Sequence, residues 1–128
     1  MAPEPRTIRA FFEKQLADLR DTIGSARIAA IVSDDGCMAP DPVMQAAVTL
    51  HGSRLRDLVA AATQPSADFE VGQPRCLIVD GMNGVLIVRP ISTRKPRLLV
   101  VVLDDRADVS RALNGVHRIA GEIETRLA

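Results

Sequence analysis

The residues best suited to chemistry are two pairs of acids, each at the end of an apolar run. Asp104 and Asp105 follow the run 98–103, and Asp34 and Asp35 end an earlier one. Acids at the tip of a buried strand are typical of phosphate-accepting sites, where carboxylates hold Mg²⁺. Such a site also needs a third carboxylate and a distant lysine from later strands. Only one further helix follows Asp105, so we reject phosphoacceptor chemistry.

The two acidic pairs can still meet, depending on how their strands are arranged. Antiparallel neighbours place the pairs at opposite ends of a sheet. Parallel neighbours gather four carboxylates, a set that can bind a divalent cation or perform acid-base chemistry. We favour turn formation and helix capping, and the cation site is the alternative.

The histidines and cysteines show no spacing of a metal or redox site. His51 and His117 lie far apart among helix-forming residues, and Cys37 and Cys76 form no CxxC pair. Two isolated thiols are typical of a reducing compartment, so we expect a cytoplasmic protein. No phosphate loop, nucleophile elbow or zinc-protease motif occurs. We therefore predict a protein with no cofactor and no metal. Missing motifs leave enzymatic activity open, because catalytic groups can also assemble in space from residues distant in sequence.

Composition excludes further classes of protein. The 16 basic and 16 acidic residues give a formal net charge of zero, and aromatic content is 2%. A chain without a positive field or stacking platforms is not expected to bind nucleic acid. The longest aliphatic run, 98–103, is too short to cross a membrane, so we expect no membrane insertion.

Periodicity and turn residues divide the 128 residues into a flexible N-terminal tail, 1–6, and a single domain, 7–128. Alternating runs indicate strands and three- to four-residue repeats indicate helices. The expected elements are a helix from 7 to 24, a strand at 27–33, a very short or absent strand at 37–39, a helix from 41 to about 63, a loop at 64–68, strands at 69–80, 85–91 and 96–104, and a helix from 105 or 108.

The run 98–103 is apolar at both parities, which predicts a central strand covered by helices on both faces. Short turns between the last three strands predict antiparallel neighbours. The expected fold is α+β: a three-layer α/β/α sandwich with a mainly antiparallel sheet of four or five strands.

Three stretches resemble the Roadblock/LC7 (dynein light chain) family. IAAIVSDDG is similar to its first hairpin, CLIVDGMNGVLIVRPIS to its later hairpin, and LLVVVLDDRADVSRALNGVHRIAGEIETRL to its closing strand and helix. The pattern is shared with profilin-like and longin-like domains. The sequence departs from the family after Gly36, where CMAPDP replaces a full second strand.

The resemblance implies a homodimer without enzymatic activity, in which the third strands pair edge to edge above the second helices. Family members serve as platforms for small Ras-like GTPases or signalling complexes. An apolar strand at the edge of a sheet would also promote aggregation if it stayed unpaired, and homodimerisation is the simplest way to cover it. Pro74 would interrupt a continuous ladder, so we expect the pairing to be concentrated at residues 75–79 or around a bulge. The expected dimer interface comprises Phe69, Val71, Cys76 and Ile78 on the strand, with Ala47, His51, Leu55 and Leu58 on the helix.

A basic cluster around the last hairpin loop is the candidate partner patch, consisting of Arg89, Arg94, Lys95 and Arg97. It is either a solvated loop or an electrostatic surface for an acidic partner. The alternative function is a small-molecule sensor of similar sandwich shape, with a ligand pocket beside the alanine-rich second helix.

Overall fold

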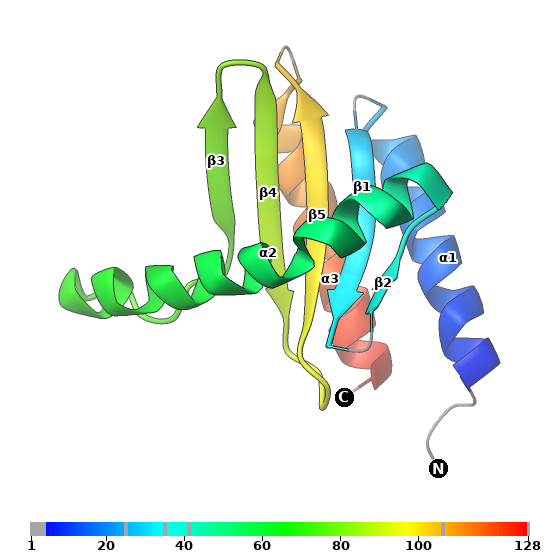
Figure 1. The fold of residues 1–128 in the computed structure, drawn as a ribbon, viewed down its shortest axis with the longest axis horizontal. Coiled ribbons are helices and arrows are strands. Elements are labelled where there is room, and N and C mark those ends of the chain that lie inside the picture. The colour runs from blue at the N-terminus through cyan, green and yellow to red at the C-terminus, as the bar shows by residue number, and fades with distance from the viewer. Residues whose placement is uncertain (1–4, 25, 35, 41, 106, 128) are drawn as a thin grey trace.

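The computed structural model describes residues 5–24, 26–34, 36–40, 42–105 and 107–127. This part of the chain forms three helices and five strands (Figure 1). The elements are α1 (Pro5–Thr22), β1 (Ala26–Ser33), β2 (Gly36–Met38), α2 (Pro42–Asp68), β3 (Leu77–Gly81), β4 (Gly84–Ile91), β5 (Arg97–Asp104) and α3 (Val109–Leu127).

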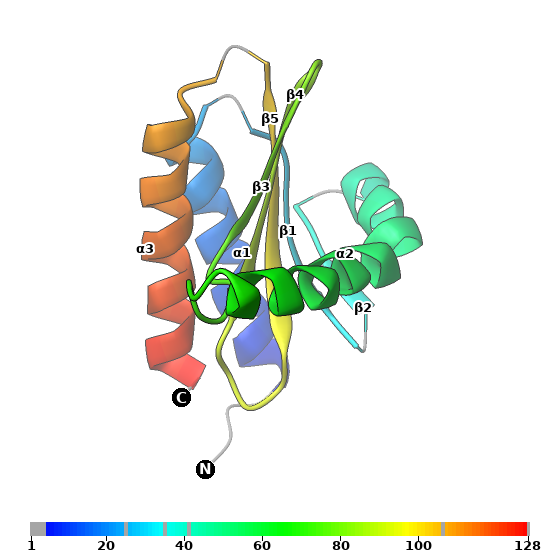
Figure 2. The ribbon, with the colours of Figure 1, turned by 90° about the vertical axis from the view of Figure 1, so that its left-hand side faces the viewer.

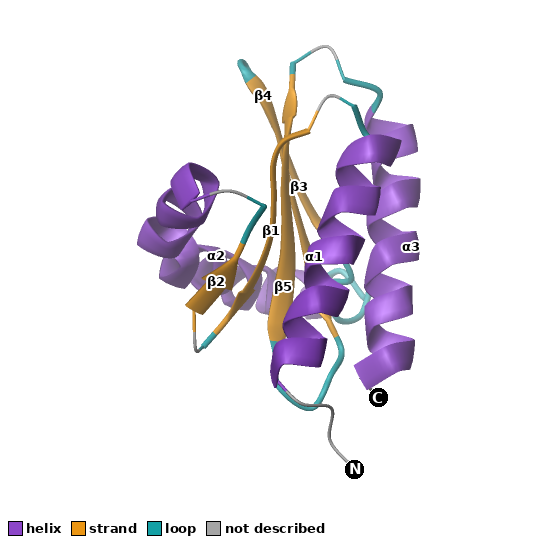
Figure 3. Ribbon diagram, turned by 90° about the vertical axis from the view of Figure 1, so that its right-hand side faces the viewer, coloured by secondary structure: helices purple, strands orange, loops and turns teal. Residues whose placement is uncertain are grey.

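The five strands form one sheet in the order β2-β1-β5-β4-β3, with every neighbouring pair antiparallel. Helices α1 and α3 lie on one face and α2 lies on the other (Figures 2 and 3). The predicted three-layer α+β sandwich and its element order are therefore confirmed.

β5 is the central strand, as its continuous apolar run predicted. Leu99 and Val101 face α1 and α3, whereas Leu98 and Val100 face α2, and all four are buried. Successive side chains point to opposite faces of a strand, so a strand between two helical layers has no polar face. This arrangement creates one core cluster on each side of the sheet.

Gln15 is the one buried polar side chain among the described residues. It is 7% exposed on α1, and its Oε1 has no hydrogen-bond partner within that part of the chain. An unsatisfied buried acceptor costs free energy, so we expect Gln15→Met to increase the free energy of unfolding by about 1–2 kcal/mol. Urea unfolding measures this change. Gln15→Glu should do the opposite because it buries a carboxylate, and an unchanged Gln15→Met variant would contradict the expectation.

Helix α2 crosses the strands and continues past β3 (Figure 1). Its buried residues Met44, Val48 and Gly52 contact the sheet, and Gly52 permits close approach because an added Cβ would lie 3.3 Å from Val32 Cγ1. The last α2 residue that packs with the sheet cluster is Val59. The turns from 60 to 68 form an overhang beyond the sheet.

The prediction of a loop at 64–68 was wrong, because α2 continues through Pro65 to Asp68. Proline removes the backbone amide that would donate to the Ala61 carbonyl, while two hydroxyl side chains add hydrogen bonds in the adjacent turns. Ser66 Oγ donates to the Ala62 carbonyl at 2.7 Å and Thr63 Oγ1 donates to the Val59 carbonyl at 3.3 Å. Both hydrogen bonds lie in the helical turns around Pro65.

The prediction of a strand over 69–80 was too long, since β3 begins at Leu77. Phe69, Val71 and Cys76 therefore do not lie on the strand. Two backbone conformations explain the difference: Glu70 has φ 60° and Gly72 has φ 82°, both of which turn the chain away from an extended path. Pro74, which has no N–H to donate, follows them.

The ends of the other elements differ less from expectation. α1 begins at Pro5, two residues inside the expected tail, and residues 1–4 lie outside the described residues. β2 is three residues long, as the prolines at 40 and 42 predicted. α3 begins after Asp108, whose Oδ1 accepts a 3.1 Å hydrogen bond from the Arg111 amide and caps the helix.

Candidate protein interaction site

β3 forms one edge of the sheet and pairs with β4 on its inner side. The two-residue turn Met82-Asn83 joins Gly81 to Gly84, which makes these glycines a hydrogen-bonded pair. Bonded and non-bonded pairs alternate along an antiparallel ladder. The backbone N–H and C=O groups of Ile78 and Asp80 therefore point outward from the sheet.

Apart from the exposed Asp80, the side chains of this edge strand are apolar and at least partly accessible. Ile78 and Val79 each expose 46% of their surface. Ile78 pairs with Ile87 of the α1/α3-side cluster, and Val79 pairs with Leu86 on the α2 side, so the two residues lie on opposite faces. An apolar edge with free backbone groups is a template for strand addition.

The α2 side of the sheet carries a row of apolar residues that α2 covers only partly. The cross-strand pairs Val79–Leu86, Leu86–Val102 and Val102–Ile28 place four side chains on one face. Leu86, Val102 and Ile28 are half-buried, and Val79 is exposed. We call these four residues the open strip.

One flank of α2 borders the open strip. Ala47 lines a pocket with Ile28, near the start of β1. His51 and Leu58 follow Ala47 at helical spacing and belong to the same flank. On the opposite flank, Arg56 Nη1 lies 3.4 Å from the Ser33 carbonyl, at the end of β1.

The structure places the eight predicted interface residues in different locations. Ala47, His51 and Leu58 are accessible on that flank, and Leu58 is 37% exposed. Leu55 is half-buried and packs within the α2-side cluster. The remaining four are divided: Ile78 lies on the β3 edge, Cys76 packs against the α1/α3-side core, and Phe69 and Val71 are exposed at the end of the overhang.

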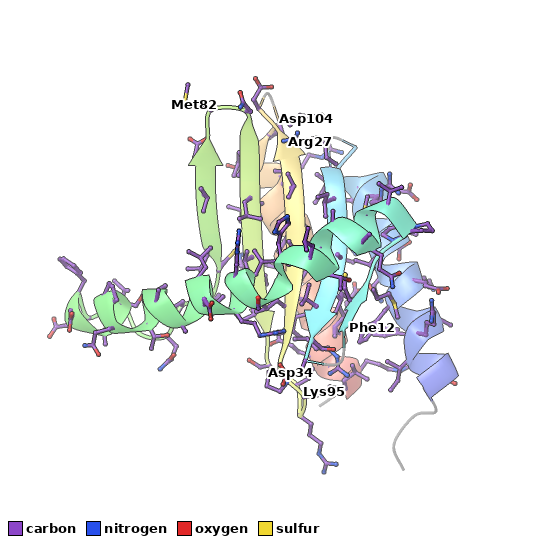
Figure 4. The ribbon with its side chains drawn as sticks, viewed as in Figure 1. Phe12, Arg27, Asp34, Met82, Lys95 and Asp104 are labelled. Atoms are coloured by element: carbon purple, nitrogen blue, oxygen red, sulfur yellow. The ribbon has the colours of Figure 1, made fainter. Side chains whose placement is uncertain are left out.

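The alternative of a cation site formed by four acids is wrong. β1 and β5 are antiparallel, with Ser33 opposite Arg97, so Asp34 and Asp104 lie at opposite ends of the sheet (Figure 4). Asp35 lies outside the described residues, and Asp105 is exposed. No group of His, Cys, Asp or Glu side chains is positioned for a metal in the part of the chain that the structure describes.

The acids take part in ion pairs with arginine instead. Asp104 Oδ1 lies 3.1 Å from Arg27 Nε, and Arg27 Nη2 also donates to the carbonyls of Asn83 and Leu103 at 3.1 and 3.3 Å. These bonds connect the start of β1, the β3–β4 hairpin and the end of β5. Asp34 Oδ1 lies 3.8 Å from Arg56 Nη1, and both side chains are largely exposed, so this pair adds little stability.

The expected basic cluster is not one surface. Arg89 is directed toward α3, where its side chain is 12% exposed. The guanidinium of Arg97 lies 5.3 Å from the centre of the Phe12 ring, and burial lowers the pKa of Arg97. Arg94 remains exposed and Lys95 is half-buried at the tip of the β4–β5 loop (Figure 4).

Arg89 belongs to a half-buried polar network with α3. Its Nη2 lies 3.2 Å from Glu124 Oε1, and its Nε donates to His117 Nδ1 at 3.2 Å. Glu124 Oε2 accepts the Ser92 amide at 2.8 Å. Burial opposes ionisation of Glu124, but the hydrogen bonds from Ser92 and Arg89 together hold its pKa below the ordinary value.

His117 must accept this hydrogen bond through an unprotonated Nδ1, because a guanidinium can only donate. Burial first, then the positive charges of Arg89 and Arg75, lower the pKa of His117 from 6.5. Protonation of His117 is therefore less favourable in the native state than in the unfolded chain. The free energy of unfolding should fall as pH decreases below 6.5, until pH passes the lower pKa of His117 in the native state. Urea unfolding at several pH values measures this slope.

His117→Gln provides the control, because it retains a side-chain acceptor without titrating. Below pH 6.5 the free energy of unfolding of the variant should depend less steeply on pH than that of the original protein. Above about pH 7.5 the two proteins should show the same pH dependence. An identical slope in both proteins would show that His117 does not contribute to it.

The two cysteines lie in environments that disfavour the thiolate. Burial raises the pKa of the Cys37 and Cys76 thiols, which favours their unreactive protonated form. None of the described helices is long and apolar enough to cross a membrane. The described surface has an unpaired apolar edge at β3, beside the open strip and the α2 overhang.

No protein-family model and no curated protein matches the sequence. A Roadblock/LC7 domain from Streptomyces avermitilis superposes with a TM-score of 0.69 at 16% identity, covering 90% of this chain and 96% of that one.

Two structures of MglB are also similar. MglB of Myxococcus xanthus has a TM-score of 0.71 at 13% identity, covering 98% of this chain and 91% of its own. The gliding protein MglB of Thermus thermophilus has a TM-score of 0.66 at 19% identity, covering 99% of this chain and 94% of its own. At these identities the likeness establishes the fold.

Proposed function

Because the chain has a Roadblock/LC7-like fold, we propose that it is a cytoplasmic regulatory homodimer that binds a small Ras-like GTPase or signalling complex and catalyses no reaction. The β3 strands of two copies pair in an antiparallel manner and join the sheets. The observation that carries this proposal is the β3 edge, with its outward backbone groups and its exposed Ile78 and Val79.

The α2 overhang supports the same arrangement. A two-fold axis perpendicular to the sheet, at the outer side of β3, rotates the overhang of one protomer onto the α2 side of the other. There it meets the open strip, beside the partner's own α2. The proposed dimer thus covers apolar surface that a single protomer exposes on both the edge and the face.

The dimer has the properties expected of a binding platform. Its two sheets form one continuous layer, and no group of His, Cys, Asp or Glu among the described residues is positioned to hold a metal ion. Similar structures include MglB, described as a gliding protein, and MglC. The Roadblock/LC7 resemblance associates this fold with GTPase regulation, which is why we infer recognition by surface complementarity. The cations of the partner patch that a GTPase could reach are Arg94 and Lys95.

Two measurements test the proposal. Sedimentation equilibrium should give the mass of a dimer at micromolar concentration. Binding is then measured between this dimer and the source organism's small Ras-like GTPases, each loaded with GDP or a non-hydrolysable GTP analogue. A dimer that binds one nucleotide state preferentially supports the proposal. A monomer contradicts the homodimer, and a dimer that binds neither state of any of them contradicts the GTPase role.

A small-molecule sensor is the second candidate, because one apolar pocket lies at the border between α2 and the sheet. Its volume is about 490 Å³, which is within the range of small-ligand sites. A sensor would be monomeric, with a melting temperature that rises on adding ligand, whereas the platform is a dimer without ligand.

A further inference from the structure

Phe69 is an exposed aromatic residue whose backbone is fixed by hydrogen bonds. It exposes 81% of its surface at the end of α2. The Val71 amide donates to the Ser66 carbonyl at 2.9 Å and the Glu70 amide donates to the Ala67 carbonyl at 3.0 Å, which is the Schellman pattern of a helix end. The Phe69 amide itself donates to the Pro65 carbonyl at 3.0 Å. The backbone that carries the Phe69 ring is thus preorganised, which lowers the entropic cost of contacting a partner.

The other two phenylalanines each have an arginine over the ring. Arg126 lies 5.1 Å from the centre of the Phe11 ring and Arg97 lies 5.3 Å from that of Phe12. Within the described ranges, no arginine stacks on Phe69. This ring therefore lacks both burial and a cationic neighbour in a single protomer.

An apolar pocket of about 490 Å³ lies at the start of α2, large enough for a phenyl ring. It is lined by Arg27, Ile28, Pro42, Val43, Met44 and Ala47. Its lining is apolar apart from Arg27, whose guanidinium could face an aromatic ring. Ile28 is also the end of the open strip, so the pocket continues the surface that the overhang of a second copy would cover.

The length of the overhang matches the distance to this pocket. α2 continues for nine residues after Val59, or about 14 Å at ~1.5 Å per residue. With strands ~4.8 Å apart, a two-fold axis beside β3 lies about 12 Å from β5 and about 17 Å from β1 of the partner. Measured across the strands, the end of the overhang therefore reaches about β5, from where a phenylalanine side chain is long enough to reach β1.

We propose that Phe69 of one protomer binds in the pocket at the start of α2 of a second copy of this chain, an inference that rests on the homodimer proposed above. By symmetry, two such contacts form in each dimer. Each buries an exposed ring against Ile28, Met44 and Ala47, with Arg27 at the rim. The Phe69 ring of one copy and the apolar pocket of the other are then both buried.

Crosslinking tests the position of the ring. Phe69→Cys and Ala47→Cys are introduced separately into two chains that also carry Cys37→Ser and Cys76→Ser. The mixed chains are treated with a short bismaleimide, and we expect a covalent heterodimer. Within one protomer these positions lie about 30 Å apart along α2, so an intramolecular link cannot form. The matched control replaces Ala47→Cys with Leu50→Cys, an exposed position on the outer side of α2, and should give little product.

The oligomeric state of the same mixture separates the two proposals. A dimer that gives no more product with Ala47→Cys than with Leu50→Cys overturns the role of Phe69 and leaves the homodimer intact. A monomer at all concentrations overturns both.

Affinity provides an independent test in the native cysteine background. Phe69→Ala should increase the dimer dissociation constant roughly 30-fold or more, as expected for a buried aromatic anchor. Its protomer should remain folded, because Phe69 is exposed. An unchanged dissociation constant would contradict the proposal.

Discussion

Replacing Ile78 by proline is expected to convert the dimer into folded monomers. The N–H of Ile78 points away from β4, so proline leaves the internal β3–β4 ladder intact but removes a donor from the edge of each copy. Loss of two hydrogen bonds of about 1 kcal/mol each weakens the dimer at least about 30-fold, and the proline ring further obstructs strand approach. Sedimentation equilibrium across a concentration series measures the change.

Two variants make this test specific to the backbone. Ile78→Thr keeps the N–H and a β-branched side chain, so its dimer should remain. Val79→Pro removes a donor that faces β4, and should therefore destabilise the protomer itself. An Ile78→Pro protein that dimerises as tightly as Ile78→Thr would show that the β3 edges do not pair.

The second large effect is expected at the network between β4 and α3. Glu124→Ala removes the carboxylate that accepts from Arg89 Nη2 and from the Ser92 amide, in a site where the Arg89 side chain is 12% exposed. Hydrogen bonds to charged groups contribute more than neutral ones, and the arginine remains buried without its partner. We expect the free energy of unfolding to fall by about 2–3 kcal/mol, measured by urea denaturation.

Glu122→Ala is the matched control on the same helix. Glu122 pairs with Arg118 at 3.3 Å, but both side chains are nearly half exposed, so its loss should cost less than about 0.5 kcal/mol. Equal effects of the two substitutions would show that burial of the Arg89–Glu124 pair does not strengthen it.

Much of the fold could be predicted from periodicity. The apolar run 98–103 predicted a central strand with two covered faces, and the prolines at 40 and 42 predicted the short β2. Strand partners could not be predicted in the same way, because pairing depends on residues distant in sequence. For this reason the choice between parallel and antiparallel arrangement of β1 and β5 stayed open.

The errors near residues 64–76 came from giving composition too much weight. Pro65 and its polar neighbours are typical of a loop, but side-chain hydrogen bonds to Val59 and Ala62 accompany a continuous helix. The apolar Phe69 and Val71 are typical of a strand, whereas the positive φ of Glu70 ends the helix there. Because that strained conformation occurs at a non-glycine residue, the sequence carried no clear signal for it.

The position of Arg89 could have been predicted from strand alternation. Arg89 has the same parity as Val85, Ile87 and Ile91, which all face α1 and α3, so it should point inward rather than join a loop surface. Its partner Glu124 is 35 positions away and gives no local signal. The α2 overhang also required the structure, since the length of a helix does not show where the sheet beneath it ends.

Hydrogen exchange of the Ile78 backbone amide tests the central claim most directly. In a single protomer this amide faces outward and should exchange rapidly, whereas in the paired dimer it donates across the joint between the two sheets. We predict strong protection well above the dimer dissociation constant and loss of protection on dilution, while the inward-facing Val79 amide stays protected throughout. Rapid exchange of Ile78 in a sample that sedimentation shows to be dimeric would contradict edge-to-edge pairing.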